Sequence, residues 1–343
     1  MYVPNRFGMF TDEEILEAKE NNKMLSIGLN LSNRCDLRCV YCFNESGRMS
    51  DDELKPYEID NLLRQCIELG LKEIVIPGAG EPLLSPYLLD IIRVCGKNGI
   101  RVEVFTNGYK LTDEHIACFD RYNTCVSIKL NSLKNGIQDY LSWKLGYSKV
   151  LYNSIDRLIE AGLTKKYRLT TSNQITKLNY NEIPDYYRYC RERQIIPKVA
   201  RLMKKGRALK NWDYLSVSEE ETKNMFSVLK NIDKNEYGYE WYDYNPNFSG
   251  GYGCRLMYYS PFIDNKGYFS PCLGRTDIIG NIKDKTLLEL WNDPKQDKYK
   301  NIDKYLSGEC TKCDNFKKLK CYSCVNENLV NNNDPFISYR KCI

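Results

Sequence analysis

The sequence predicts an α/β protein, a partial (β/α)6 TIM-like barrel that is followed by a loop-rich C-terminal domain. Short apolar runs alternate with longer helical patterns from residue 24 onward, which is typical of repeated βα units around a parallel sheet. This alternation ends near residue 205, and glycine, tyrosine and cysteine then become frequent. We therefore divide the chain into a lead-in, a barrel, a bridging region and a C-terminal domain, at residues 1–24, 25–205, 206–245 and 246–343.

The barrel region contains six predicted strands, of which the first five are each followed by a predicted helix. In the first of these helices Ile59, Leu62, Leu63 and Ile67 share one face, and Gly70 is a suitable C-cap. Six strands are too few for a closed eight-stranded barrel, so we expect an open one with ligands at the carboxyl ends of its strands. The predicted strands cover 24–31, 72–78, 100–108, 124–132, 167–174 and 195–203, and the predicted helices cover 56–70, 85–99, 111–122, 147–162 and 181–193.

The segments after the barrel are less regular. Residues 204–232 predict a loop and one helix. The C-terminal domain contains too many loops for apolar packing alone to hold it together, so we expect metal clusters to stabilise it.

Fifteen cysteines and one histidine are the most unusual feature of the composition. Thiols in a reducing cytoplasm do not persist as structural disulfides. A chain with this many cysteines therefore suggests metal ligation. His115 lies in the polar stretch LTDEHIACF and is expected on a helix surface, which leaves no histidine for a Cys-His nucleophile pair.

The charge and hydropathy pattern excludes other classes. Lys and Arg exceed Asp and Glu by five, an excess spread along the chain that does not favour a nucleic-acid partner. No apolar run approaches the roughly 18 residues that a membrane span needs, and the first residues lack a secretion signal. We expect a cytoplasmic protein with no membrane partner.

The stretch CDLRCVYC places Cys35, Cys39 and Cys42 in the predicted loop after the first strand. Three thiolates at this spacing can hold three irons of a [4Fe-4S] cluster and leave the fourth iron without a protein ligand. An open iron is a place where a substrate or cofactor can bind. The alternative is a zinc site with a distant fourth cysteine.

The pattern C-x3-C-x-aromatic-C after the first strand of a partial barrel resembles the radical S-adenosylmethionine (SAM) enzymes. The resemblance covers roughly residues 25–205 and implies that the open iron binds SAM. One electron from the cluster then cleaves SAM to methionine and a 5′-deoxyadenosyl radical, which abstracts hydrogen from a substrate. It also implies that Tyr41 contacts the adenine.

One turn motif and two single residues are also similar to SAM-binding positions of that family. PGAGEP, after the second strand, resembles the GGEP motif, with Ala79 in place of the first glycine. The resemblance implies that Gly78, Gly80 and Glu81 bind SAM, with the carboxylate accepting from its amino group. Read alone, such a stretch is simply a turn. Ser127, at the end of the fourth strand, matches the position of a ribose-contacting polar residue of the family. Asn173, on the fifth strand, is a further candidate, for which a strand-end polar residue without a ligand role is an equal alternative.

The C-terminal cysteines resemble those of the SPASM domains of radical SAM proteins, by the C-x9-15-G-x4-C pattern around Gly267 and the later C-x2-C-x7-C-x2-C run. The resemblance implies two auxiliary [4Fe-4S] clusters, three clusters in all. A zinc ribbon built from the two C-x2-C pairs is the alternative. The outer cluster would be held by Cys310, Cys313, Cys321 and Cys342, and the inner one by Cys254, Cys272 and Cys324. The remaining cysteines, expected as packed apolar residues, are Cys66, Cys95, Cys118, Cys125 and Cys190.

The resemblance implies an oxidoreductase or maturase that modifies an unactivated C–H bond. We expect a ribosomally made peptide as substrate; the alternative is a small natural-product or sugar intermediate. Leu273 stands where sulfatase-maturing members have an aspartate, which disfavours that reaction unless Asp264 or Asp277 replaces it. A non-catalytic electron carrier or zinc scaffold is a further alternative.

The expected partners follow from this chemistry. A flavodoxin- or ferredoxin-type protein would donate electrons. Only 34 residues precede the first cysteine, so a separate protein would recognise a leader peptide, if one is needed. The basic stretch 200–210 could bind an acidic or phosphorylated substrate or be solvated, and the tyrosine-rich stretch 237–254 could line a cleft or pack between domains.

Overall fold

The computed structural model describes residues 1–4, 9–242, 248–251, 253–274 and 277–339. Its strands form one nine-stranded sheet in the order β6-β5-β4-β3-β2-β1-β7-β8-β9. Neighbouring strands from β6 to β7 are parallel, and the last two pairings are antiparallel. The strands are β1 Ser26–Leu29, β2 Glu73–Ile76, β3 Arg101–Thr106, β4 Cys125–Lys129, β5 Leu169–Gln174, β6 Ile196–Ala200, β7 Phe262–Ile263, β8 Tyr268–Ser270 and β9 Gly280–Asn281.

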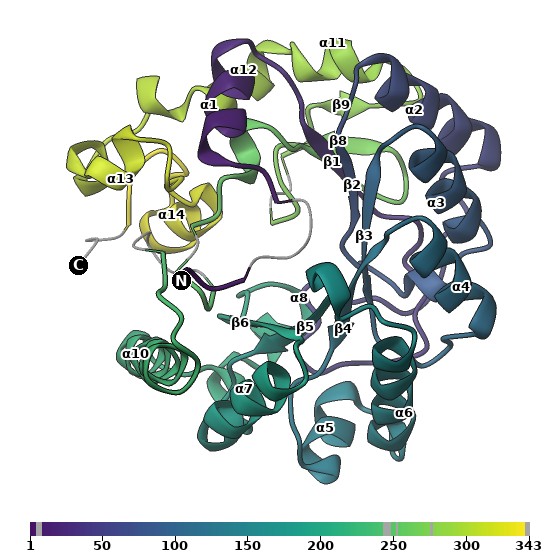
Figure 1. Cartoon of the computed structure of the whole chain (residues 1–343). Coiled ribbons are helices and arrows are strands. Elements are labelled where there is room, and N and C mark those ends of the chain that lie inside the picture. The colour runs from purple at the N-terminus through teal and green to yellow at the C-terminus, as the bar shows by residue number, and fades with distance from the viewer. Residues whose placement is uncertain (5–8, 243–247, 252, 275–276, 340–343) are drawn as a thin grey trace.

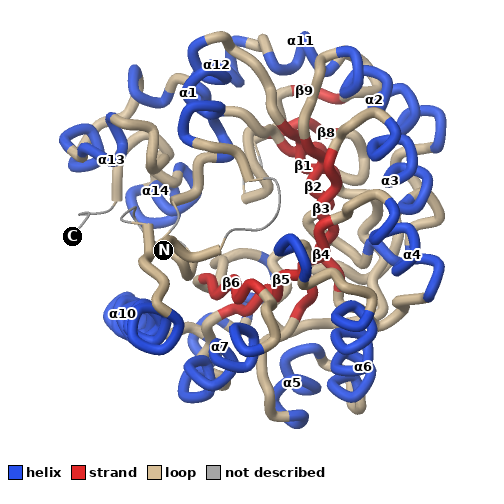
Figure 2. The backbone as a smooth tube through the Cα atoms, in the orientation of Figure 1, coloured by secondary structure: helices blue, strands red, loops and turns tan. Residues whose placement is uncertain are grey.

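The helices of the βα units lie outside an inner arc of strands (Figures 1 and 2). Each presents an apolar stripe to the sheet, as α2 does with Ile59, Leu62 and Leu63, all nearly inaccessible to solvent. The helices are α1 Asp12–Glu20, α2 Pro56–Glu68, α3 Leu88–Lys97, α4 Asp113–Arg121, α5 Asn135–Ser142, α6 Tyr147–Glu160, α7 Ile183–Glu192, α8 Gly206–Lys210, α9 Trp212–Leu215, α10 Glu219–Tyr237, α11 Leu287–Trp291, α12 Pro294–Lys300, α13 Asp314–Lys317 and α14 Val325–Asn332.

The predicted open α/β barrel is confirmed, because β6 and β9 end the sheet and do not pair with each other. The C-terminal residues add strands to this same sheet. β7 pairs with β1, with Gly28 opposite Phe262 and Leu29 opposite Ile263. The barrel and the C-terminal region therefore share a continuous backbone hydrogen-bond network.

The region after β6 differs from the prediction of a loop and one helix. Two short helices, α8 and α9, precede the long helix α10. Their buried residues are few, Ala208 and Leu215, so neither helix has a periodic pattern long enough to be recognised in the sequence. They cover the loop that carries the first three cysteines.

The described part of the tyrosine-rich stretch is packed. Trp241 is buried, its indole nitrogen donates to Asp233 at 2.6 Å, and its ring lies against Phe226. Asp233 also pairs with Arg191 of α7 at 2.8 Å. Residues 243–247 and 252 of this stretch lie outside the described residues. Within the described ranges, no helix is both long and apolar enough to cross a membrane.

Candidate active site

The three cysteines of the first motif lie on one loop at the carboxyl end of β1. All three thiols are free and half-buried. The ends of the loop are tied together, because Cys35 N–H donates to the Gly47 carbonyl at 3.1 Å and Gly47 N–H donates to Asn33 at 2.8 Å. The loop therefore presents three thiols from a closed backbone ring.

Burial sets the protonation state of these thiols in the absence of metal. It raises the pKa of Cys35 to about 12 and that of Cys39 to about 11, and the neighbouring Cys42 adds to the shift of Cys39. Metal ligation requires thiolates, so loading the loop must release protons.

Helix α8 holds the cysteine loop from outside. The Arg207 guanidinium donates to the Cys39 carbonyl at 2.8 Å and to the Ser46 carbonyl at 3.1 and 3.2 Å, and its N–H donates to the Cys42 carbonyl at 2.8 Å. Gly206 allows this approach, since its φ is +57° and a Cβ there would lie 2.4 Å from the Phe43 carbonyl oxygen. The basic stretch that was a candidate for substrate binding thus supplies a backbone clamp.

Tyr41 is buried in a small apolar cluster beside the loop, with Leu141, Leu202 and Leu215. Its hydroxyl accepts from the side chain of Asn131 at 2.6 Å. The ring is therefore fixed within the wall beside the cysteines, and its predicted adenine contact stays a prediction.

The PGAGEP turn packs against the start of the cysteine loop. Gly80 has φ +110°, and a Cβ there would lie 2.0 Å from the Ser32 carbonyl oxygen. Gly78 has φ +70°, and its Cβ would lie 2.9 Å from the Phe105 carbonyl oxygen. Both positions require glycine, because a side chain at Gly80 would push the turn away from the cysteine loop and one at Gly78 would push it away from β3.

The Glu81 carboxylate is buried at the end of this turn. It accepts from the Thr106 hydroxyl at 2.5 Å and from the Asn107 and Leu83 N–H groups at 2.7 and 3.0 Å. Burial raises the pKa of Glu81 to about 7, and these donors oppose the shift. Two carboxylate oxygens have about four lone-pair sites, so one remains for a ligand such as the predicted SAM amino group.

Polar side chains of β4, β5 and β6 face the barrel interior. Ser127 lies opposite Thr170, and both hydroxyls are buried without a hydrogen-bond partner. In the next row Lys129, Ser172 and Lys198 are neighbours, and Lys129 Nζ donates to Ser172 at 3.3 Å. Unpartnered buried hydroxyls are exceptional in proteins, so this row has donors and acceptors available for a ligand.

Lys129 is a residue that the sequence reading missed. Its ammonium lies 5.2 Å from the centroid of the Tyr41 ring. Burial lowers its pKa to about 8, while the nearby thiols of Cys39 and Cys42 oppose this shift. In the sequence, Lys129 is the one charged residue of the strand VSIKL. This lone charge is the signal from which a role in the site could have been predicted.

Asn173 is not brought into the same group. Its neighbour Thr171 bonds Tyr186 of α7, so both side chains point toward the helices, and the alternating residues point into the barrel. The Asn173 amide donates to the carbonyls of Leu130 and Asn131 at 3.2 and 3.0 Å. Its amide donors are used within the wall, and its predicted SAM contact stays a prediction.

The C-terminal cysteines fall into two neighbourhoods. Tyr322 N–H donates to the Cys254 carbonyl at 3.2 Å, which joins the segment of Cys254 to that of Cys324. Burial raises the pKa of Cys324 to about 11, and the Cys254 thiol adds to this shift. Cys272 lies nearby, since it and Cys324 both act on Tyr322. These are the three thiols that the sequence assigned to an inner cluster.

The other neighbourhood contains Cys310, Cys313 and Cys321. Cys313 N–H donates to the Cys310 carbonyl at 3.1 Å. Their predicted fourth partner, Cys342, lies outside the described residues. In the part of the chain that the structure describes, no three Cys, His, Asp or Glu side chains converge as ligands for a single metal ion. The five cysteines expected in the core are all buried: Cys66, Cys95, Cys118, Cys125 and Cys190.

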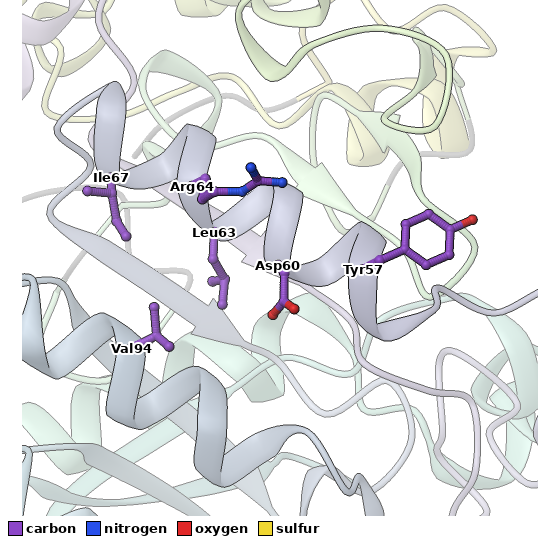
Figure 3. Close-up of a pocket in the computed structure, with 6 residues that line it drawn as sticks. All are labelled: Tyr57, Asp60, Leu63, Arg64, Ile67 and Val94. Carbon is purple, nitrogen blue, oxygen red and sulfur yellow. The ribbon is translucent and has the colours of Figure 1, made fainter.

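A separate hollow of about 470 Å³ lies on the outside of the barrel. Figure 3 shows five residues of α2 and one of α3 around it, including Tyr57, Asp60 and Val94. The sheet separates these helices from the interior row of Ser127 and Lys129, so this hollow does not belong to the cysteine site.

Comparison with known proteins gives two family matches. Residues 29–190 match the radical SAM superfamily, and residues 254–314 match an iron-sulfur cluster-binding domain, SPASM. The first match runs from the end of β1 into α7 and includes the first cysteine loop, and the second covers four cysteines of the C-terminal set, Cys254, Cys272, Cys310 and Cys313.

Two curated relatives are about a quarter identical to this chain over the aligned residues. A probable GTP 3′,8-cyclase of Methanothermobacter marburgensis is 26% identical over 193 residues, which is 55% of this chain and 62% of that protein. The sporulation killing factor maturation protein SkfB of Bacillus subtilis is 24% identical over 273 residues, 78% of this chain and 64% of that protein. Both alignments span less than two thirds of the relative.

Among solved structures, Streptococcus suis SuiB bound to S-adenosylmethionine has the same fold. Its TM-score is 0.72 at 18% identity, over 97% of this chain and 83% of SuiB. SuiB bound to its precursor peptide SuiA gives a TM-score of 0.69 at 18% identity, over 95% of this chain and 78% of SuiB.

The residues present fit an iron-sulfur cluster with SAM beside it. Three free thiols project from one closed loop, Gly80 leaves the turn next to them without a side chain, and the Ser127 hydroxyl is buried without a partner. The chain therefore belongs to the radical SAM superfamily, in its SPASM subgroup, and is an enzyme that uses S-adenosylmethionine and [4Fe-4S] clusters.

Proposed function

We propose that this enzyme cleaves SAM reductively at the Cys35, Cys39 and Cys42 loop and uses the resulting radical to mature a ribosomally made peptide. The observation that carries the proposed SAM cleavage is the cysteine loop held by Arg207. This loop offers three thiols at the end of a barrel whose interior contains the buried, unpartnered hydroxyls of Ser127 and Thr170. When bound, the cluster and SAM supply a one-electron cleavage that yields a hydrogen-abstracting radical.

The residues of the chain divide the work of holding these groups. Cys35, Cys39 and Cys42 would bind the cluster. Glu81 would accept from the SAM amino group with its remaining lone pair, and Ser127 would bond a polar group of SAM. Lys129 places a cation beside the thiolates and so offsets their charge. We propose no ligand role for Asn173.

We propose two auxiliary clusters, three in all. The proximity of Cys254, Cys272 and Cys324 supports the inner one. Lys198, in the same interior row as Lys129, acts electrostatically on both Lys129 and Cys254. The barrel interior therefore connects the two cysteine sets, and a substrate held there would lie between them.

The peptide assignment draws on the extent of the resemblance. The SkfB alignment covers 78% of this chain, and the SuiB fold, seen with a precursor peptide, covers 95%. We further propose that the modification is a cross-link, a thioether or an epimerisation. We also propose that a separate protein recognises the leader peptide.

A small-molecule substrate is the second candidate, because GTP 3′,8-cyclases also align with this chain. A probable GTP 3′,8-cyclase of Methanocaldococcus jannaschii aligns over 78% of this chain, the same share as SkfB, so alignment coverage does not decide between the two candidates. The SuiB fold, seen with a precursor peptide at a TM-score of 0.69, is the observation that favours the peptide.

The experiment that separates the two candidates measures 5′-deoxyadenosine from the anaerobically reconstituted enzyme with SAM and dithionite. Peptide and small-molecule fractions of a host extract are added separately. Stimulation by the peptide fraction alone supports peptide maturation, and stimulation by the small-molecule fraction alone contradicts it.

The cysteine assignment has its own test. Replacing Cys39 and Cys42 by Ala should abolish 5′-deoxyadenosine formation and leave most of the auxiliary iron bound, as measured by product and iron analysis. SAM cleavage that persists in this variant would disprove the assignment of the loop.

A further inference from the structure

Three aromatic side chains lie exposed on one surface beside the barrel. Tyr140 and Trp143 come from α5 and its end, and Tyr214 comes from α9. Their exposed fractions are 42, 61 and 52%. The Tyr140 ring centroid lies 5.9 Å from that of Trp143 and 6.2 Å from that of Tyr214. We call these three residues the aromatic patch.

Trp143 occupies an unfavourable backbone conformation. It ends α5 in the left-handed region, with φ +55° and ψ +43°, where glycine is the usual residue. A bulky residue there is strained, and an exposed ring buries too little apolar area to offset this. Strained, exposed aromatic residues are found where a surface has a binding role.

The aromatic patch lies directly behind the cysteine loop. Val40 N–H donates to the Leu141 carbonyl at 3.0 Å, and Arg38 N–H donates to the Ser142 carbonyl at 3.2 Å. Leu141 is buried, and Cys39 packs against the same small apolar cluster. One layer of side chains therefore separates this surface from a thiol of the first cysteine set.

The segments that carry the aromatic patch are strongly basic. Residues 134–149 and 203–215 contain seven Lys or Arg and two Asp, a net charge of +5. The whole chain also has a net charge of +5, so its remaining residues sum to zero. The two segments lie more than fifty residues apart in the sequence, and folding brings their positive charge together on one side. Such a surface attracts an acidic partner and steers its approach.

We propose that the aromatic patch and its basic surroundings are the docking surface for a small acidic electron-transfer protein. This inference rests on the proposed function, because the electron would enter at the Cys35, Cys39 and Cys42 loop. The donor loses one electron, the cluster gains one electron, and no atom passes between the proteins. Aromatic residues at the centre and charges at the rim are typical of transient interfaces.

The test uses an acidic flavodoxin as probe, with the reconstituted full-length enzyme. The patch variant carries Trp143→Gly and Lys204→Glu. The control variant carries Tyr57→Ala and Lys97→Glu, which remove one exposed ring and reverse one exposed charge on α2 and α3, away from α5 (Figure 1). Two quantities are measured: the affinity for oxidised flavodoxin at low and high salt, and SAM cleavage driven by reduced flavodoxin or by dithionite.

We expect the patch variant to lose affinity and flavodoxin-driven cleavage by about tenfold or more at low salt, and to keep dithionite-driven cleavage. The control variant should match the wild type in all measurements. Equal flavodoxin binding by both variants would overturn the docking proposal. Loss of peptide stimulation with dithionite would also overturn it and would indicate that the surface binds substrate. Absence of dithionite-driven cleavage in the wild type would contradict the proposed function instead.

Discussion

At the scale of single residues, Arg207 shows how a side chain that is not itself a predicted cluster ligand can hold the loop that carries the ligands. It donates to the carbonyls of Cys39 and Ser46, so removing it leaves the Cys39 carbonyl with the Cys42 N–H alone and takes both guanidinium bonds from the Ser46 carbonyl. Each such loss costs about 1–3 kcal/mol.

We predict that Arg207→Gln loosens the cysteine loop. Hydrogen exchange of residues 35–47 in the metal-free protein should become faster, and less iron should be retained after reconstitution. Lys210→Gln is the matched control, because Lys210 lies on the same helix and pairs only with exposed Glu45. Equal exchange in the two variants would show that the guanidinium does not hold the loop.

Gly80 provides a second prediction at this scale. Gly80→Ala should destabilise the protein by several kcal/mol in urea unfolding, since the added Cβ meets the Ser32 carbonyl. Gly99→Ala is the control: its φ is +72°, but its Cβ would enter open space, so it should cost only about 1–2 kcal/mol. Similar costs at both positions would mean that the turn does not need its close approach.

At the scale of elements, α4 contains the one histidine of the chain in a capping role. Thr112 donates to His115 Nδ1, its hydroxyl at 2.7 Å, and His115 N–H donates back to that hydroxyl at 3.3 Å. Burial lowers the pKa of His115. Only the neutral ring can accept at Nδ1, and a cation at a helix N-terminus is unfavourable.

This cap makes stability depend on pH with a defined sign. Below the ordinary histidine pKa the unfolded chain binds a proton more readily than the folded one, so stability should fall as pH decreases through about 6. His115→Gln keeps an acceptor and should remove this contribution. Unfolding by urea at pH 5 and 7 measures the difference, and a single-histidine NMR titration gives the pKa directly. An unshifted pKa would contradict the prediction.

Elements also show what the sequence could and could not predict. The barrel strands were predictable because continuous apolar runs such as IVI, in β2, are buried or half-buried on both faces. Helices α8 and α9 were not, because each gains its burial from the cysteine loop. Which face of its strand Asn173 takes was not predictable, since a strand-end position in the sequence does not reveal it. Lys129 could be placed beside the thiols only once the pairing register of its strand was known.

At the scale of the whole molecule, the C-terminal region is tied to the barrel by more than the sheet. Trp291 donates to the Asn22 carbonyl at 2.8 Å, and Lys19 of α1 pairs with Asp303 at 2.9 Å. The C-terminal region therefore also holds α1 and the turn that leads from it toward β1.

We predict that deleting residues 254–343 does not leave a stable barrel. The deletion exposes the edge of β1, together with the apolar surface that packs on Phe269 and Trp291. The truncated chain should aggregate or lose cooperative unfolding in calorimetry. A soluble truncated chain that unfolds cooperatively would show that the barrel is independently stable.

The pairing of Gly28 with Phe262 also restricts how such enzymes can be recombined. A Cβ at Gly28 would lie 3.0 Å from the Phe262 ring, so these two positions must match across the join. A chimera that takes its C-terminal half from a relative would have to bring a compatible residue into the first strand as well. Exchange of cluster domains between members of this subgroup therefore requires compatible residues where β1 and β7 pair. A linker of suitable length is not enough.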